Sequence, residues 1–393
     1  MVVFIDLLGF GLIIPLLPYY AKAFGAGGTQ VGLQLASYAA AQLVGGPLLG
    51  RLSDRIGRRP VLLVCLAGSC AGFLLLGLAR SLAMLFVSRI LAGLTGGNLP
   101  VVQAYVADVT PPRDRAKRMG LIGVAFGLGF IIGPAAGGLL SRFGAAVPAF
   151  AAAALSALDL LAAFIWLPEP GSFARSRSGH GSPALSRGSV TQSAHPLLDL
   201  KAALLKPRVG PLLVSRFVFF LAFVIFQSIF PLYALERFGF EAHATAYVFS
   251  YIGFLIVLVQ GAAIGRLTAR FTERQLLVGG VALMAAALAA WAWAPTVPAL
   301  LAVLPFIALA GGTFGTVNSS VISQSVGAGE VGGMMGLSAS VEAMTRIVGP
   351  ALGGALIERL GPAAPGLFGG AVLLGLLPYA WTRFRVTSRR RGA

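Results

Sequence analysis

The stretch GRLSDRIGRRP (residues 50–60) lies between two long apolar runs. A related stretch, GRLTARFTER (residues 265–274), lies between two further apolar runs, and Gly265 follows Gly50 by 215 positions. The glycine-rich segments GPAAGG (residues 133–138) and GPALGG (residues 349–354) form a second pair, 216 positions apart. These repeats predict two homologous membrane halves, an arrangement typical of transporters whose substrate site lies where the halves meet.

The composition indicates that a bilayer surrounds most of the chain. Hydrophobic residues make up 57% and charged residues 11%, with a mean hydropathy of +0.86, whereas about a quarter of the residues of a soluble domain are charged. A transmembrane helix needs about 20 apolar residues. Twelve such runs are present: 1–21, 31–49, 60–79, 82–107, 119–140, 145–167, 209–235, 244–264, 275–294, 297–322, 334–357 and 362–382. Alternating segments of about ten residues, which a transmembrane barrel requires, do not occur. The predicted fold class is therefore an all-α membrane protein with twelve transmembrane helices in two pseudo-symmetric six-helix bundles.

The net charge of +17 is unevenly distributed between the loops. Loops on one side, together with the middle segment and the tail, hold 22 of the 30 lysine and arginine residues, whereas the opposite loops hold five. This asymmetry follows the positive-inside rule, so we expect a multi-pass protein of the cell (inner or plasma) membrane with both termini in the cytoplasm. Nucleic acid is not an expected partner, because binding it requires a basic face on a folded domain.

The middle of the chain differs in composition from both halves. Serine, glycine, proline and arginine dominate it, as is typical of a linker. The predicted domains are an N-terminal six-helix bundle (1–167), a cytoplasmic linker (168–208), and a C-terminal six-helix bundle with a basic cytoplasmic tail (209–393). The two cysteines are interpreted as small buried residues, and no metal, cofactor or catalytic group is expected. We expect a monomer whose partners are the lipid bilayer, a small-molecule substrate and protons.

Four motifs resemble one transporter family. Residues 50–60 are similar to the signature loop between helices 2 and 3 of the major facilitator superfamily, and the Arg89-Ile90-Leu91-Ala92-Gly93 segment to its helix 4 arginine motif. The opening Asp6 to Pro18 resembles helix 1 of its tetracycline and multidrug efflux branch. The helix 5 pattern of its proton-coupled antiporters matches six residues: Gly120, Gly129, Gly133, Pro134, Gly137 and Gly138. The resemblance covers nearly the whole chain outside the linker and implies a twelve-helix transporter.

The resemblance also implies roles for two of these motifs. The signature loop would form a conformational gate on the cytoplasmic side through six residues: Gly50, Asp54, Arg55, Gly57, Arg58 and Arg59. Asp54 is expected to accept hydrogen bonds at the start of a neighbouring helix, although a plain positive-inside loop would also explain the arginines. In the helix 5 motif, the glycines allow close helix packing and Pro134 bends the helix, which would also limit proton leak. The repeats lack some of these residues, since Ala269 replaces Asp54 and Thr345 replaces Gly129.

Six charged residues lie inside the predicted spans: Asp6, Arg89, Asp159, Arg216, Glu342 and Arg346. A charge at mid-span costs about 2.5–3.5 kcal/mol on insertion scales, so such residues usually serve a pathway or pair with a partner. All of them except Arg216 are candidate proton-coupling residues. For Asp6 the alternative is a helix cap, and for Glu342 and Arg346 it is a structural ion pair, because four positions separate them. Arg89 is expected to pair with or tune a nearby acid, while Arg216 is expected to snorkel to the membrane surface.

Polar and aromatic residues within the spans predict a substrate site. The candidates are Tyr38, Gln42, Asn98, Gln103, Phe223, Gln227, Gln260 and Asn318. Such polar side chains either bond between helices or line a cavity. Phe219, Phe223, Phe226 and Phe230 would form an aromatic wall or simply pack. Apolar walls with few polar groups favour amphiphilic or aromatic substrates over sugars. Tetracycline itself is a doubtful substrate, because the segments near Gly72 and Leu283 lack the acids of the tetracycline pumps.

Three functions are compatible with these patterns. A proton-driven exporter (antiporter) of small lipophilic or drug-like compounds, working by alternating access, accounts for Asp6 and the helix 5 motif. A metabolite symporter or uniporter of the same fold would not need that motif. A membrane enzyme or assembly factor is disfavoured, because no paired catalytic carboxylates, histidine or cysteine constellation, or nucleotide-binding loop occurs. The energy source is therefore predicted to be an ion gradient.

Overall fold

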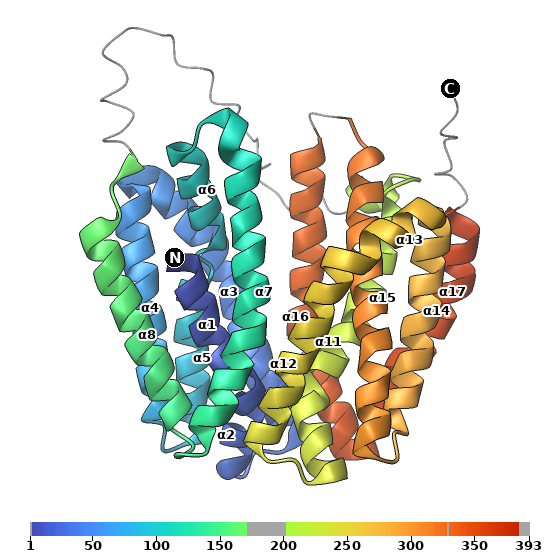
Figure 1. Cartoon of the computed structure of the whole chain (residues 1–393), viewed down its shortest axis with the longest axis horizontal. Coiled ribbons are helices and arrows are strands. Elements are labelled where there is room, and N and C mark those ends of the chain that lie inside the picture. Colours follow the sequence, from blue (N-terminus) through green and yellow to red (C-terminus); the bar gives the residue numbers. More distant parts are fainter. Residues whose placement is uncertain (1, 171–201, 328–329, 385–393) are drawn as a thin grey trace, which may run out of the picture. The chain divides into compact units, whose positions relative to one another are not determined.

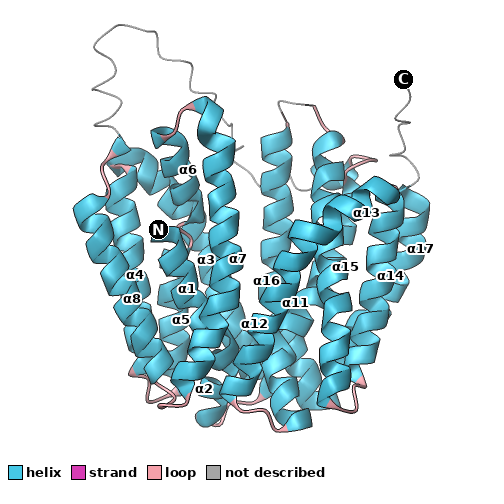
Figure 2. Ribbon diagram, viewed as in Figure 1, coloured by secondary structure: helices cyan, strands magenta, loops and turns pink. Residues whose placement is uncertain are grey.

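The computed structural model describes residues 2–170, 202–327 and 330–384, and helices make up nearly all of them (Figures 1 and 2). The linker between residues 171 and 201 and the tail from residue 385 lie outside the described residues. The main helices before the linker are α1 (Val2–Ile13), α2 (Leu17–Ala23), α3 (Gly28–Ile56), α4 (Arg58–Gly77), α5 (Leu82–Gly96), α6 (Leu99–Val109), α7 (Arg115–Ser141) and α8 (Val147–Trp166). Those after it are α11 (Gly210–Phe238), α12 (Ala242–Leu258), α13 (Ile264–Arg270), α14 (Glu273–Ala292), α15 (Val297–Gln324), α16 (Val331–Leu360) and α17 (Ala364–Arg383).

The helices agree with the predicted membrane spans. Among the described residues, 10 helical segments are long and apolar enough to cross a bilayer. The two remaining predicted spans, 31–49 and 334–357, lie in α3 and α16, which have 29 and 30 residues. These two helices are less apolar because glycine, serine, glutamine and charged residues interrupt their apolar runs. The fold class is confirmed: the chain is an all-α membrane protein of twelve transmembrane helices.

Three of the spans are interrupted within the membrane. The first changes from α1 through a short 3-10 turn (Ile14–Leu16) to α2, where Pro15 and Pro18 interrupt backbone pairing. The fourth breaks between α5 and α6 at Gly97 and Asn98. The eighth passes from α12 to α13 through a π-helical turn, Val259–Ala263, a feature frequent at functional sites. Broken helices at membrane depth occur where side chains or a cavity satisfy the freed backbone groups.

The helices cluster into two compact units. The first unit comprises residues 1–185 and 239–253, and the second comprises residues 186–238 and 254–393. In the first unit α1 packs on α7 and α8, and α5 packs on α3 and α4. In the second unit α11 packs on α16 and α17, and α14 packs on α15 and α17. Residues 239–253 belong to the first unit although the predicted C-terminal bundle included them. The end of this segment lies close to α7, since a Cβ at Gly253 would lie 2.6 Å from the carbonyl oxygen of Phe130.

Candidate functional site: intramembrane charges and a broken helix

The break in the fourth span joins three of the predicted site residues. Pro100 cannot donate a backbone hydrogen bond, so α6 restarts after Asn98 and the carbonyl of Gly96 is left without a helical partner. The side-chain amide of Gln42 donates to this carbonyl at 2.9 Å. Asn98, at the break itself, donates through Nδ2 to Oδ2 of Asp6 at 3.1 Å. Asp6 of α1 is thus hydrogen-bonded to the break between α5 and α6, and it is partly buried.

Tyr38 lies one turn before Gln42 on α3. Its backbone oxygen lies against Gly93, and a Cβ at Gly96 would lie 2.6 Å from its hydroxyl. The ring also packs on Phe10, with 5.3 Å between ring centroids. The glycines of α5 thus give Tyr38 and Gln42 direct access to the α5 backbone in the last turns before Asn98.

Asp159 of α8 is fully buried in the first unit. Neither carboxyl oxygen has a hydrogen-bond partner among the described residues, and the hydroxyl of Ser156, one turn earlier, has none either. Helix α8 packs against α1 and α4, so this carboxyl lies in the interior of the bundle. An ionised carboxylate in such a place is costly, and an isolated acid is normally retained for a function.

Arg89 of α5 is also buried, with 1% of its surface exposed. Its guanidinium lies 5.9 Å from the ring centroid of Phe73, while Nε and Nη2 have no hydrogen-bond partner in the described part of the chain. The sequence predicted that Arg89 pairs with or tunes a nearby acid. No ion pair between Arg89 and Asp6 or Asp159 occurs among the described residues, because Asp6 bonds to Asn98 and Asp159 stands alone.

The helix 5 motif lies in α7, and its glycines form a tight contact with α1. A Cβ at Gly133 would lie 2.8 Å from Cα of Gly11, and one at Gly129 would lie 3.1 Å from Cβ of Leu7. Gly137 lies directly against the carbonyl oxygen of Leu12. Gly138 faces another way, towards Ala246 of α12, and Gly120 meets nothing within 4 Å. Close backbone packing therefore depends on Gly129, Gly133 and Gly137, the last with Pro134 in the turn before it.

The signature loop is almost entirely helical. Gly50 to Ile56 form the last turns of α3, and α4 begins at Arg58, so only Gly57 lies between the two helices. Gly57 has a φ of +104°, which favours glycine. The carboxylate of Glu169 accepts the backbone amides of Arg58 and Arg59 at 2.9 and 3.1 Å. Asp54 does not cap α4, although the sequence predicts that it caps a neighbouring helix. Glu169, which lies more than 100 residues later in the sequence, caps α4 instead.

Asp54 instead pairs with Arg58 one turn later in sequence. Arg58 also bonds to Asp108 at the end of α6, with 3.2 Å between Nε and Oδ2, and to Ser53 at 2.7 Å. Arg59 donates to the carbonyl oxygen of Phe164 at 2.6 Å, and its guanidinium lies over the Phe164 ring. Arg55 is exposed. The loop thus connects α3 to α4, α6 and the end of α8. The sequence motif did not predict its partners Asp108 and Glu169, because these two residues lie far from the loop along the chain.

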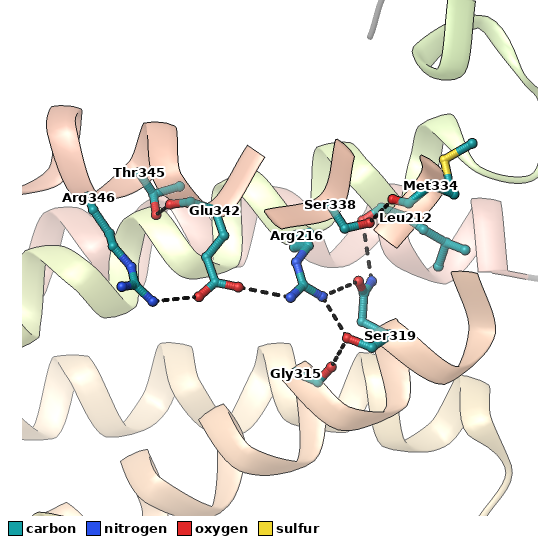
Figure 3. Close-up of polar contacts among 10 residues, drawn as sticks. Leu212, Arg216, Gly315, Ser319, Met334, Ser338, Glu342, Thr345 and Arg346 are labelled. Atoms are coloured by element: carbon teal, nitrogen blue, oxygen red, sulfur yellow. Dashed lines mark hydrogen bonds and ion pairs between the residues drawn. The ribbon is translucent and has the colours of Figure 1, made fainter. Parts of the chain in front are cut away.

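In the second unit, Arg216 is the centre of a polar network across α11, α15 and α16 (Figure 3). Its Nη2 donates to Oε2 of Glu342 at 2.9 Å, and its Nη1 donates to Asn318 at 3.2 Å and to Ser319 at 3.0 Å. Asn318 is fully buried and donates in turn to the carbonyl of Leu212 at 3.3 Å. The snorkelling predicted for Arg216 is wrong, because three interhelical bonds hold this side chain with 9% of its surface exposed. Asn318 therefore holds Arg216 in position.

Glu342 is shared between two arginines. Its Oε1 accepts Nη2 of Arg346 at 3.0 Å, so the ion pair expected from their spacing is present. The Arg346 side chain is 57% exposed, whereas that of Glu342 is 22% exposed. The network thus runs from a buried guanidinium to an accessible one. Figure 3 shows Glu342 between the two arginines.

Aromatic residues of α11 separate into a buried set and a partly exposed set. Phe219, Phe226 and Phe230 are buried and pack, so only Phe223 of the predicted wall is partly exposed. Phe220, which the sequence reading did not include, is also partly exposed and lies 5.1 Å beneath the Arg216 guanidinium. The remaining predicted substrate residues are more scattered: Gln227 is partly exposed on α11, Gln103 is exposed on α6, and Gln260 is exposed in the π-helical turn.

The sequence of the whole chain matches that of one family of known proteins. The Major Facilitator Superfamily matches residues 1–319 and 260–393, which together span the chain. The chain belongs to the Major Facilitator Superfamily. It is therefore a multi-pass membrane transporter and not an enzyme.

Curated members of the superfamily with similar sequences have different names. The chain is 31% identical to tetracycline resistance protein, class C, of Escherichia coli, over 96% of this chain and 95% of that protein. It is 31% identical to multidrug resistance protein 2 of Bacillus subtilis (strain 168), over 95% and 90%. Identity to solute carrier family 22 member 18 of Mus musculus is also 31%, over 88% and 85%.

Solved structures of transporters share the fold. The crystal structure of the human organic anion transporter MFSD10 (TETRAN) aligns with a TM-score of 0.66 at 25% identity, covering 96% of this chain and 97% of that one. The nucleoside transporter NupG aligns with a TM-score of 0.80 over 98% and 97%, but at 14% identity this likeness concerns the fold alone.

Proposed function

We propose that this superfamily member is a proton-coupled exporter, which moves small lipophilic, drug-like compounds out of the cell by alternating access. The observation that carries the proposal is Asp159, a fully buried acid within a membrane span and without a partner among the described residues. Its neutral form is tolerated there, whereas its ionised form needs water or a partner. A change in access would therefore couple proton binding to the state of the transporter.

Asp6 is the second proton-coupling residue in this proposal. It lies in α1, where Asn98 from the break in the fourth span donates one hydrogen bond to it. Arg89 would tune these acids without pairing with them. Glu342 and Arg346 are weaker candidates for proton transfer, because both carboxylate oxygens of Glu342 already accept guanidinium donors.

Two further observations support export in exchange for protons. Gly129, Gly133 and Gly137 of the helix 5 motif make backbone-close contacts with α1, which would limit proton leak. Two relatives of equal identity carry the names of tetracycline and multidrug resistance proteins. Within the first unit, Tyr38 and Gln42 are proposed substrate contacts, and residues 50–59 would act as the gate. Within the second unit, Phe223 and Gln227 are proposed substrate contacts.

A proteoliposome assay tests this function. An imposed pH gradient should drive transport of at least one compound from a panel of lipophilic dyes by the unaltered protein. Asp159→Asn and Asp6→Asn should each abolish gradient-driven transport yet retain dye binding. Glu241→Gln is the matched control, since it neutralises an exposed acid of the same unit and should leave transport unchanged. Transport by both aspartate variants that still follows the gradient would remove these acids from the mechanism.

A metabolite symporter or uniporter is the second candidate, because a relative of the same identity is named as a solute carrier. The same liposomes separate the possibilities. Antiport requires substrate and protons to move in opposite directions, symport requires the same direction, and a uniporter ignores the pH gradient.

The arginine and lysine asymmetry supports a cell (inner or plasma) membrane location with cytoplasmic termini. In a variant that lacks the native cysteines, Gly27→Cys should react with an impermeant thiol reagent in intact cells, whereas Ser178→Cys should not. The reverse pattern would invert the topology. We also propose a monomer, which the mass of the purified protein in detergent would test.

A further inference from the structure

The intramembrane charges of the second unit do not cancel. Arg216, Glu342 and Arg346 carry two positive charges and one negative charge, and they form a continuous chain (Figure 3). The other acids that the structure describes in this unit, Glu236, Glu273, Glu330 and Glu358, lie at or near helix ends. One positive charge therefore remains within the span. An uncompensated charge at this depth is costly and marks a place where a pathway or ligand supplies the opposite charge.

The uncompensated positive charge is assigned to Arg346, the accessible end of this row of three charged side chains. A guanidinium has five N–H donors, and a single hydrogen bond, from Nη2 to Glu342, engages Arg346 in the described part of the protein. Its Nε and Nη1 donors remain available on a side chain that is 57% exposed. Two adjacent guanidinium donors match the two oxygens of a carboxylate or sulfonate, so Arg346 suits an anionic group better than a neutral one.

A membrane headgroup is a poor source for this anion. Arg346 lies near the middle of α16, a helix of 30 residues. At about 1.5 Å per residue, roughly 20 Å of helix separates it from either end. This distance exceeds the reach of an arginine side chain, so phosphate groups at the bilayer surface do not satisfy its donors.

An aromatic surface lies beside the charge chain. Phe220, Phe223 and Gln227 occur at spacings of three and four on α11, which places them on one helix face with Arg216, and all three are partly exposed. The two rings pack at 6.4 Å between centroids, edge to face. Glycines of α15 lie beneath them, because a Cβ at Gly315 would lie 3.3 Å from Cζ of Phe220 and one at Gly311 would lie 3.5 Å from Cε2 of Phe223. The same surface therefore offers flat apolar contacts next to Arg216, which Glu342 connects to Arg346.

We propose that the second unit binds the transported compound as an amphipathic organic anion, with its carboxylate or sulfonate on Arg346 and its aromatic body against Phe220 and Phe223. Arg216 is a positioning residue, since it fixes Glu342 and thereby orients Arg346. This proposal rests on the transport function proposed above and narrows its substrate class, because lipophilic cations would be repelled at Arg346.

Three probes with the same naphthyl body test the charge preference: 1-naphthaleneacetate, 1-naphthaleneacetamide and 1-naphthylmethylammonium. Their binding to the full-length protein in detergent is measured by titration calorimetry at neutral pH. We expect the anion to bind about 10-fold or more tightly than the amide, since hydrogen bonds between two charged groups are stronger than those to a neutral one. The cation should bind most weakly. Equal affinities, or a preference for the cation, would overturn the proposal.

Variants of one helix assign the preference to Arg346. Arg346→Gln should reduce anion affinity to that of the amide and leave amide affinity unchanged, whereas Arg346→Lys should restore part of the preference. Arg359→Gln is the matched control, because it removes an exposed charge from the last turn of the same helix. A full anion preference in Arg346→Gln would contradict the assignment, and its retained amide binding reports that the variant is folded.

Transport measurements separate this proposal from the proposed function. Anion binding that depends on Arg346, without transport driven by a pH gradient, would uphold the anion site and defeat proton-coupled export. Transport of the naphthyl cation but not of the anion, driven by the gradient, would uphold export and defeat the anion site.

Discussion

In the first unit, α4 begins after Gly57, and the carboxylate of Glu169 from beyond the end of α8 caps its first amides. In the second unit, α14 begins after Thr272, whose hydroxyl accepts the amide of Gln275 at 3.3 Å while the Gln275 side chain accepts the amide of Thr272 at 2.9 Å. The same position in the repeat is thus capped by a distant acid in one unit and by a local capping box in the other. Only in the first unit does the capping group itself come from another part of the chain.

The bond between the start of this helix and the end of the fourth span also differs between the two units. In the first unit Arg58 bonds to Asp108. In the repeat, Glu273 occupies the position of Arg58 and Gln324 that of Asp108, 215 and 216 positions later. These two also touch, because Gln324 donates to Glu273 at 3.2 Å. A charged pair in the first unit therefore corresponds to a weaker, single-charge hydrogen bond in the second.

The intramembrane charges differ more strongly than the loops. Asp6 and Asp159 of the first unit have no cationic partner among the described residues, and Arg89 has no acidic one. Arg216, Glu342 and Arg346 of the second unit are all paired. The two halves therefore share a helical scaffold but not their intramembrane charges: isolated acids suit proton exchange, and a paired network with a surplus cation suits an anion.

The largest expected difference between the two units is in the stability lost when an intramembrane acid is neutralised. Glu342→Gln should destabilise the protein by about 3 kcal/mol or more, because it leaves the buried Arg216 without its counter-charge. Asp159→Asn should cost little stability, since no described partner is lost. Thermal unfolding in detergent measures both. A larger loss from Asp159→Asn than from Glu342→Gln would show that Asp159 has a partner in the folded protein.

A smaller difference in stability is expected between the glycine-mediated helix contacts of the two repeats, at Gly133 of α7 and Gly349 of α16. Gly133→Ala should cost about 1–3 kcal/mol, because its new methyl group would meet the backbone of Gly11. Gly349→Ala should cost less, since the nearest atoms to its new methyl group belong to the side chain of Val224 and not to backbone. Gly120→Ala, which meets nothing within 4 Å, is the control. Proteoliposomes should also leak protons faster with Gly133→Ala than with Gly349→Ala, and equal leak rates would remove the sealing role of α7.

The gate predicts a difference in transport rather than in stability. Asp54→Asn should slow transport several-fold, because it weakens the Arg58 network that ties α3 to α6. Glu273→Gln should have less effect, because Gln324 can bond to either side chain. Initial transport rates at equal protein levels measure both changes. Equal slowing would mean that the two repeats act as equivalent gates.

The smallest effect is expected where the repeats agree. Arg59 lies over Phe164, and Arg274 lies over Trp381 with a 4.4 Å separation and a 2.9 Å hydrogen bond to its backbone carbonyl. Arg59→Gln and Arg274→Gln should each cost about 0.5–1 kcal/mol, the usual range of an exposed cation–π contact. Matched losses in thermal unfolding would sharpen the comparison, whereas a much larger loss at one site would show that this feature has diverged too.

The sequence alone determined the twelve spans, the division into repeats and the family, because these depend on the length of apolar runs and on the spacing of glycine, proline and arginine. It also predicted the Glu342–Arg346 pair, which depends only on helical periodicity. Tertiary structure alone decided which distant groups meet. Glu169 reaches α4, Asn98 reaches Asp6 at a helix break, and Arg216 is drawn to Glu342 instead of to the membrane surface. Local spacing cannot encode such contacts, because the cost of a buried charge depends on neighbours that helix packing brings from elsewhere in the chain.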